Sequence, residues 1–144
     1  MEIIICRNAQ RVGEVAAAKA ARIAAAVGPG IVLGVATGSS PVQAFAELAK
    51  LVAAGELDLS EASAFALDEY VGIPEGHPQS YHEVIRQTVT EPMGLDPARV
   101  HVPNGFADDL AAACQRSVEL LANLVHVRAL RQLDCDEGRP VRPP

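Results

Sequence analysis

The sequence has 144 residues, enough for one ordinary hydrophobic core and too few for two complete domains. Its formal net charge is −6 and its lysines and arginines form no cluster, so we expect no nucleic-acid partner, because that role needs a basic patch. A small anionic ligand stays compatible with this composition, since one local site can be positive on an acidic protein.

Four short apolar runs predict β-strands. Each is mostly apolar and shorter than an ordinary helix, and they cover residues 2–6, 31–36, 62–67 and 99–103. The run "IVLGVA" at 31–36 is continuous, which is typical of a strand buried on both faces of its sheet.

Helix signals separate these runs. Asn8 is a candidate N-cap for a helix that stops at Gly28-Pro29-Gly30, and a second helical pattern follows Pro41 and ends at Gly55. Ser80 is placed to cap a third helix. This alternation of strands and helices predicts βαβ units and a mostly parallel sheet.

A last helix is expected to begin at Asp108 or Asp109. Its apolar face consists of Leu110, Cys114, Val118, Leu121 and Val125. Residues 134–144, "DCDEGRPVRPP", form a polar, Pro-rich end for which we expect disorder.

The cysteines and the hydropathy pattern indicate a cytoplasmic protein. Cys6, Cys114 and Cys135 are far apart and outside any C-x-x-C spacing, so reduced thiols are expected. The opening "MEIIIC" is too short for a secretory signal, and the longest Ala-rich stretch is interrupted by charged residues. We therefore expect no membrane segment.

The turn "ATGSSP" is the first candidate site, because ligands of parallel sheets bind beyond the carboxyl ends of the strands. Gly38 permits a tight turn, Ser39 and Ser40 offer hydroxyls, and Pro41 suits the first position of a helix. This pattern is typical of phosphate binding. A capping box between Ser40 and Gln43 explains it equally well without a ligand.

The acids that follow the third strand are the second candidate site. Asp68 can act as a general base if it lies within reach of the proton that it removes. Glu69 is not expected to pair with it, because neighbouring residues of an extended chain point to opposite sides. From the residues alone, a solvated loop remains the alternative for both acids.

Three segments carry a family resemblance: "VLGVATGSSP", "FALDEYVGIPEGHPQSY" and "EPMGLDPARVHVPNG". In this order and with these separations they resemble glucosamine-6-phosphate deaminases, over residues 1–115. The resemblance implies an α/β fold with a Rossmann-like, mostly parallel sheet and flanking helices, here truncated after about four strands. It also implies a homo-oligomer.

The resemblance further implies an activity in amino-sugar catabolism. Such enzymes convert glucosamine 6-phosphate and water to fructose 6-phosphate and ammonia, which suggests a hydrolase acting on a C–N bond. No organic cofactor and no metal are expected, and the partner is a small sugar phosphate. None of the four histidines has zinc-site spacing.

The site residues carried over by resemblance are few. The phosphate would be held by Thr37, Gly38, Ser39 and Ser40. Asp68 would be the base of the enolisation step, which moves a proton between C2 and C1 of the opened sugar. Glu69 and His77 are expected as further residues on the substrate side.

The resemblance ends near residue 116. The family continues with a "DGHIGFNEP"-like loop that opens the sugar ring, and the 144 residues contain no such segment. We therefore expect residues 1–115 to be the N-terminal part of such a domain and 116–144 to be a divergent tail, as in a shortened or frameshifted gene product. A 6-phosphogluconolactonase-like enzyme and a non-catalytic sugar-phosphate-binding remnant are the alternatives.

Overall fold

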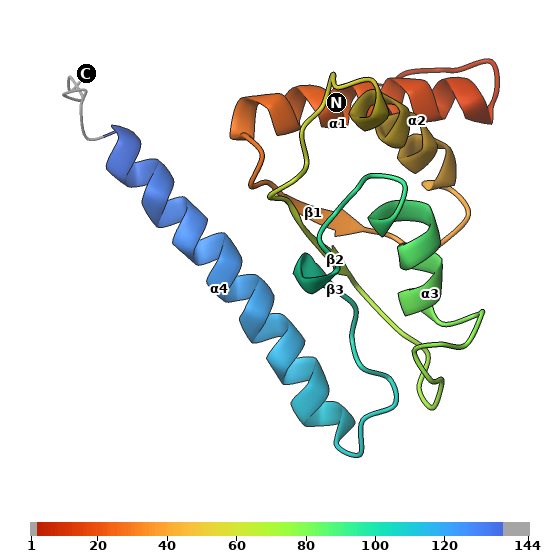
Figure 1. Cartoon of the computed structure of the whole chain (residues 1–144), viewed down its shortest axis with the longest axis vertical. Coiled ribbons are helices and arrows are strands. Elements are labelled where there is room, and N and C mark those ends of the chain that lie inside the picture. The colour runs from red at the N-terminus through yellow and green to blue at the C-terminus, as the bar shows by residue number, and fades with distance from the viewer. Residues whose placement is uncertain (1–2, 137–144) are drawn as a thin grey trace.

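The computed structural model describes the backbone of residues 3–136 and the side chains of residues 3–124. Its centre is a parallel sheet of three strands in the order β1-β2-β3: β1 (Val32–Val35), β2 (Ser63–Ala66) and β3 (Val100–His101). Helices connect the strands along the chain and flank the sheet (Figure 1). The expected α/β class with a parallel sheet is confirmed.

Local capping explains where the helices begin and end. Before α1 (Ala9–Val27), the Asn8 side chain accepts a hydrogen bond from the Arg11 amide at 2.8 Å, and Gly28 follows with a φ of 97°. After α2 (Val42–Ala53), Gly55 adopts a φ of 72°. Each of these stops was expected, because only glycine adopts such φ angles without steric cost.

The two faces of the sheet are covered differently. Ala64 and Ala66 of β2 face the main core, which includes Leu48 of α2. On the opposite face, the rings of Phe65 and His101 lie 4.6 Å apart. Helix α4 (Leu110–Asp136) runs beside this second face, away from α1 and α2 (Figure 1).

The expected first strand is wrong for residues 3–6. These residues form no strand, and the side chains of Ile3 and Ile5 are 73% and 93% exposed. A strand is stable only when a neighbouring strand accepts its backbone hydrogen bonds. Within residues 3–136 the sheet offers no such neighbour, so three strands form and not four.

The third helix departs from a regular α-helix. Ser80 caps α3 (Tyr81–Ile85) as expected, but the helix then widens into a π-helical turn, η1 (Arg86–Thr90). There the Glu91 amide donates to the Arg86 carbonyl oxygen, five residues back. A short 3₁₀ turn, η2 (Pro97–Arg99), precedes β3.

Helix α4 begins after Asp109, whose carboxylate accepts a hydrogen bond from the Ala112 amide at 2.9 Å. This agrees with one of the two expected caps. Its expected apolar face is mostly uncovered: Leu110, Cys114 and Val118 are exposed and Leu121 is half-buried, while Ala113, which lies outside that face, is buried. The side chain of Val125 and the residues after 136 lie outside the described part of the chain.

Candidate active site

Asp68 lies two residues beyond the end of β2, at the carboxyl edge of the sheet where a ligand was expected. Its exposed side chain is at the rim of a cavity of about 360 Å³, formed by the loops after β2 and β3 and the first turns of α4. Val71, Leu110 and Val118 give this cavity a mostly apolar wall. A carboxylate in this place is accessible to a small ligand.

Polar groups from the loop after β3 also line this cavity. Asn104 and Gly105 line it together with Asp68, as does Cys114 of α4. The Asn104 side-chain oxygen accepts a hydrogen bond from the Phe106 amide at 2.9 Å, which shapes the loop. Asn104 and Gly105 were not predicted as site residues, although "PNG" directly after a strand is the signal that could have found them.

The expected phosphate-binding turn lies at the same edge of the sheet. Val35 of β1 is in register with Ala66 of β2 and the strands are parallel, so the loops after both strands leave the sheet on one side. Thr37 is half-buried, and Gly38, Ser39 and Ser40 are exposed. The lining of the Asp68 cavity includes none of these four residues.

The capping box between Ser40 and Gln43, the alternative explanation of this turn, does not form. Pro41 occupies the cap position of α2, and no side chain within the described turn bonds to the start of the helix. The Phe45 amide instead donates to the Pro41 carbonyl oxygen at 2.9 Å, as part of the helix itself. The hydroxyls of Ser39 and Ser40 are therefore not used as helix caps and face solvent.

Glu69 is turned toward the start of α3. Its carboxylate accepts hydrogen bonds from the Ser80 hydroxyl at 2.6 Å and from the backbone amides of Tyr70, Tyr81 and His82 at 2.8, 3.0 and 3.2 Å. Burial raises the pKa of Glu69, but these hydrogen bonds outweigh it and hold the pKa below its ordinary value. Glu69 is therefore an ionised residue that binds the backbone.

Two aromatic residues flank this carboxylate. The hydroxyls of Tyr70 and Tyr81 are 3.2 Å apart, and their ring centroids are separated by 4.9 Å. The hydrogen bond between the two hydroxyls, together with the charge interaction of the pair, raises the pKa of Tyr70. Tyr70 is 54% exposed, so this residue is not part of the core.

His77 forms hydrogen bonds within the loop that joins Tyr70 to α3. Its Nδ1 accepts a hydrogen bond from the Gln79 amide at 3.1 Å, and its carbonyl oxygen accepts one from the Ser80 amide at 2.8 Å. The side chain is exposed. It is not among the residues that line the Asp68 cavity, and a role on the substrate side stays a prediction.

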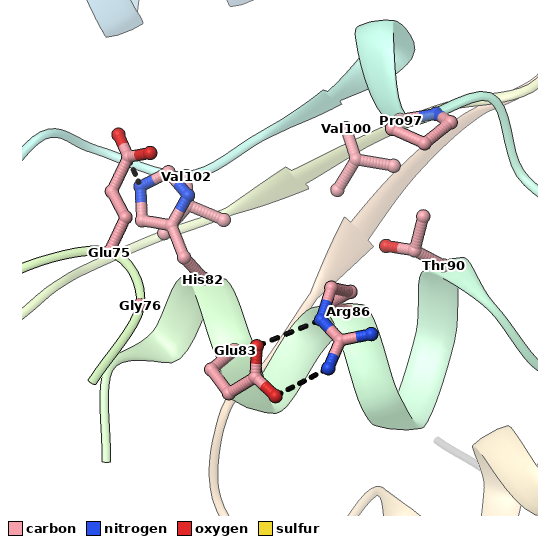
Figure 2. A pocket seen from close by; sticks show the side chains of 9 residues that line it. All are labelled: Glu75, Gly76, His82, Glu83, Arg86, Thr90, Pro97, Val100 and Val102. Atoms are coloured by element: carbon pink, nitrogen blue, oxygen red, sulfur yellow. Dashed lines mark hydrogen bonds and ion pairs between the residues drawn. The ribbon is translucent and has the colours of Figure 1, made fainter. Parts of the chain in front are cut away.

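A second cavity, of about 330 Å³, lies between α3, η1 and β3 (Figure 2). Val100 and Val102 form its apolar side. On the other side, Arg86 bonds Glu83 at 2.5 and 2.8 Å, and His82 Nε2 lies 3.7 Å from a Glu75 oxygen. The Arg86 charge is thus neutralised within the protein, so this cavity offers no free cation to a phosphate.

Among the side chains of residues 3–124, no group of three or more His, Cys, Asp or Glu residues gathers. No helix within the described backbone, residues 3–136, is long and apolar enough to cross a membrane.

Comparison with known proteins decides the family. Residues 7–136 match the family of glucosamine-6-phosphate isomerases and 6-phosphogluconolactonases. The chain belongs to this family. Among its relatives is the glucosamine-6-phosphate deaminase of Cutibacterium acnes, which is 53% identical over 115 residues, or 79% of this chain and 43% of that protein. The corresponding enzyme of Pseudarthrobacter chlorophenolicus is 47% identical over 114 residues, which again cover 79% of this chain and 43% of that protein.

Solved structures of the family share the fold. A monomeric glucosamine-6-phosphate deaminase superposes with a TM-score of 0.81 at 31% identity, over 86% of this chain and 51% of that one. The 6-phosphogluconolactonase of Trypanosoma brucei superposes with a TM-score of 0.59 at 18% identity, over 82% of this chain and 47% of that one. This likeness shows the fold alone. The chain thus spans less than half the length of the curated family members it matches.

Proposed function

We propose that this chain supplies the sugar-phosphate-binding and enolising part of a glucosamine-6-phosphate deaminase. The observation that supports this most is the position of Asp68, at the rim of a cavity on the sheet edge that also carries the "ATGSSP" turn. The relatives named as deaminases at 53% and 47% identity support the choice of substrate.

The chemistry follows from these groups. A hydrogen on a carbon beside a carbonyl or imine is acidic enough for a positioned carboxylate to remove it. Asp68 takes the proton from C2 of the opened amino sugar and returns it to C1, while a proton of the amino nitrogen passes to O1 through water, so that C1 becomes a hydroxymethyl group and C2 an imine. Water then adds to C2 and ammonia leaves. The hydroxyls and amides of the turn at 37–40 hold the phosphate and so orient the sugar.

Ring opening has no assigned residue in these 144 residues. For the chain alone we therefore expect binding of glucosamine 6-phosphate with little or no release of ammonia. We also expect slow exchange of the C1 hydrogen of fructose 6-phosphate with deuterated water, because that step needs the base and only the small open-chain fraction of the sugar.

The test combines these three measurements on the wild-type chain and on Asp68→Asn. The variant should bind with an affinity within about twofold of wild type and should lose the C1 exchange. Binding without exchange in the wild type would favour the non-catalytic sugar-phosphate-binding alternative. Rapid ammonia release would show that the ring opens without the missing loop, and no binding at all would overturn the proposed substrate.

A further inference from the structure

Glu69 joins two parts of the chain that are separated in sequence. One part is the end of β2, where Asp68 leaves the sheet, and the other is the start of α3. Both carboxylate oxygens are used: one accepts from the amides of Tyr70 and Tyr81, and the other from the Ser80 hydroxyl and the His82 amide. The loop between Tyr70 and Ser80 is therefore closed at its base.

The hydrogen bond between Glu69 and Ser80 is partly buried, and Ser80 makes a second hydrogen bond beside it. Ser80 is completely buried, and its hydroxyl donates to Glu69 while it accepts from the His82 amide at 3.2 Å. Hydrogen bonds to a charged group are stronger than neutral ones, and a buried partner left unpaired is costly. Glu69 thus fixes the chain at the end of β2 against the first residues of α3, and neither part can move far without losing these hydrogen bonds.

A second contact holds the same segment from the opposite loop. The Gly72 amide donates to the Gly105 carbonyl oxygen at 2.8 Å. A Cβ at Gly105 would lie 2.9 Å from the Tyr70 carbonyl carbon and 3.1 Å from Glu69 Cγ, so the two loops are in direct contact. Asp68 directly precedes the segment from Glu69 to Gly72, which these two contacts fix in place.

We propose that Glu69 is a positioning residue, which directs the Asp68 carboxylate toward the cavity by fixing the backbone that follows it. This inference rests on the proposed role of Asp68. Glu69 also lines the Asp68 cavity, but its carboxylate oxygens are bonded at the start of α3, so the backbone that carries Asp68 is held at the very next residue. A small displacement of a catalytic base lowers the rate of proton transfer strongly, because the base must lie within hydrogen-bond distance of the proton that it removes.

The test uses the whole chain and three variants. Glu69→Gln keeps the shape of the side chain but places an amide group against backbone donors. Ser80→Ala removes one of the four donors and leaves the charge. Glu75→Gln is the matched control, since it removes the same charge from the same loop at a side chain that is 66% exposed.

Two readouts follow Asp68 directly. The first is the residual dipolar coupling of the amides at 67–70, which reports the direction of the backbone without any ligand. The second is the rate of C1 exchange of fructose 6-phosphate and its half-saturating concentration. For Glu69→Gln we expect changed couplings and an exchange rate lower by about tenfold, with half-saturation within about twofold. Ser80→Ala should show a smaller loss and Glu75→Gln none.

The outcomes separate the proposals. A purely structural role for Glu69 would lower the melting temperature while leaving couplings and exchange rate unchanged below it, and this result would overturn the inference. If the wild type binds no sugar phosphate, the proposed function fails. The couplings still decide the positioning role in that case, since unchanged couplings in both Glu69→Gln and Ser80→Ala would contradict it.

Discussion

The Gly72 amide donates a hydrogen bond of 2.8 Å to the carbonyl oxygen of Gly105, and so connects the loop after β2 to the loop after β3. Both loops line the Asp68 cavity. Beside this contact, Gly105 lies so close to the Tyr70 backbone that there is no room for a Cβ, which leads to the first prediction.

Gly105→Ala should destabilise the protein by about 2 kcal/mol or more, because the new methyl group would overlap the Tyr70 carbonyl oxygen and the backbone must move. Urea unfolding measures this change. Gly76→Ala is the control, since a Cβ there meets no atom within 4 Å, and it should differ little from wild type. Equal stability of the two variants would contradict the close contact at Gly105.

Gly13→Ala should also destabilise the protein, although glycine-to-alanine changes within helices usually stabilise by up to about 1 kcal/mol. The reason is that α1 and α2 touch at this position: an added Cβ would lie 2.7 Å from the Gln43 Cβ and 2.8 Å from its carbonyl carbon. The midpoint of urea unfolding reports the sign. A higher midpoint would mean that the two helices can separate at little cost.

Glu69 should make the free energy of unfolding depend on pH in the acid range. Its folded-state pKa is below the ordinary 4.5, so the unfolded chain binds more protons. This contribution is fully present above pH 4.5 and is lost as the pH falls through the folded pKa. Urea unfolding between pH 6 and pH 3 should therefore show a shallower decline for Glu69→Gln than for wild type. The exposed Glu83, with a pKa of about 2 beside Arg86, contributes equally to both proteins.

His101 should add a separate step near neutral pH. Burial beside Phe65 lowers the pKa of His101 from 6.5, so the unfolded state takes up a proton first as the pH falls. Stability is full above pH 6.5 and declines below it. His101→Phe should remove this step while keeping a ring beside Phe65. An unchanged slope between pH 7 and pH 5.5 in that variant would exclude His101 as its source.

The exposed apolar side chains should cause self-association. Val118 of α4 is 63% exposed next to the Asp68 cavity, and Ile5 is 93% exposed in an unpaired β-branched segment. Sedimentation velocity at micromolar concentrations should show species larger than the monomer. Val118→Lys should shift the distribution toward monomer, while Gln115→Lys, on an already polar position of the same helix, should not. A single monomeric species in the wild type would contradict this prediction.

The parts of the fold that were predictable from the sequence depend on short-range physics. Asn8, Ser80 and Asp109 act on amides two or three residues away, and Gly55 needs only its own φ angle, so the local pattern suffices. The edge position of Asp68 followed from the general rule for parallel sheets.

What could not be predicted depends on partners distant in sequence. Residues 3–6 have the composition of a strand, but strand formation depends on a neighbour that the sequence pattern does not reveal. The hydrogen bonds of the Glu69 carboxylate were not predicted, because their donors come from residues up to thirteen positions away. The contact between Tyr70 and Gly105 joins two different loops, and no local signal marks it.

The hydrogen bonds of Glu69 also have a consequence for the order of folding. They close a segment of about a dozen residues, a loop length for which the ends meet within roughly 10–100 ns in a flexible chain. The contact between Gly72 and Gly105 spans a much longer stretch and includes the pairing of β3 with β2. The backbone around Asp68 can therefore become ordered from the α3 side before the last strand joins the sheet.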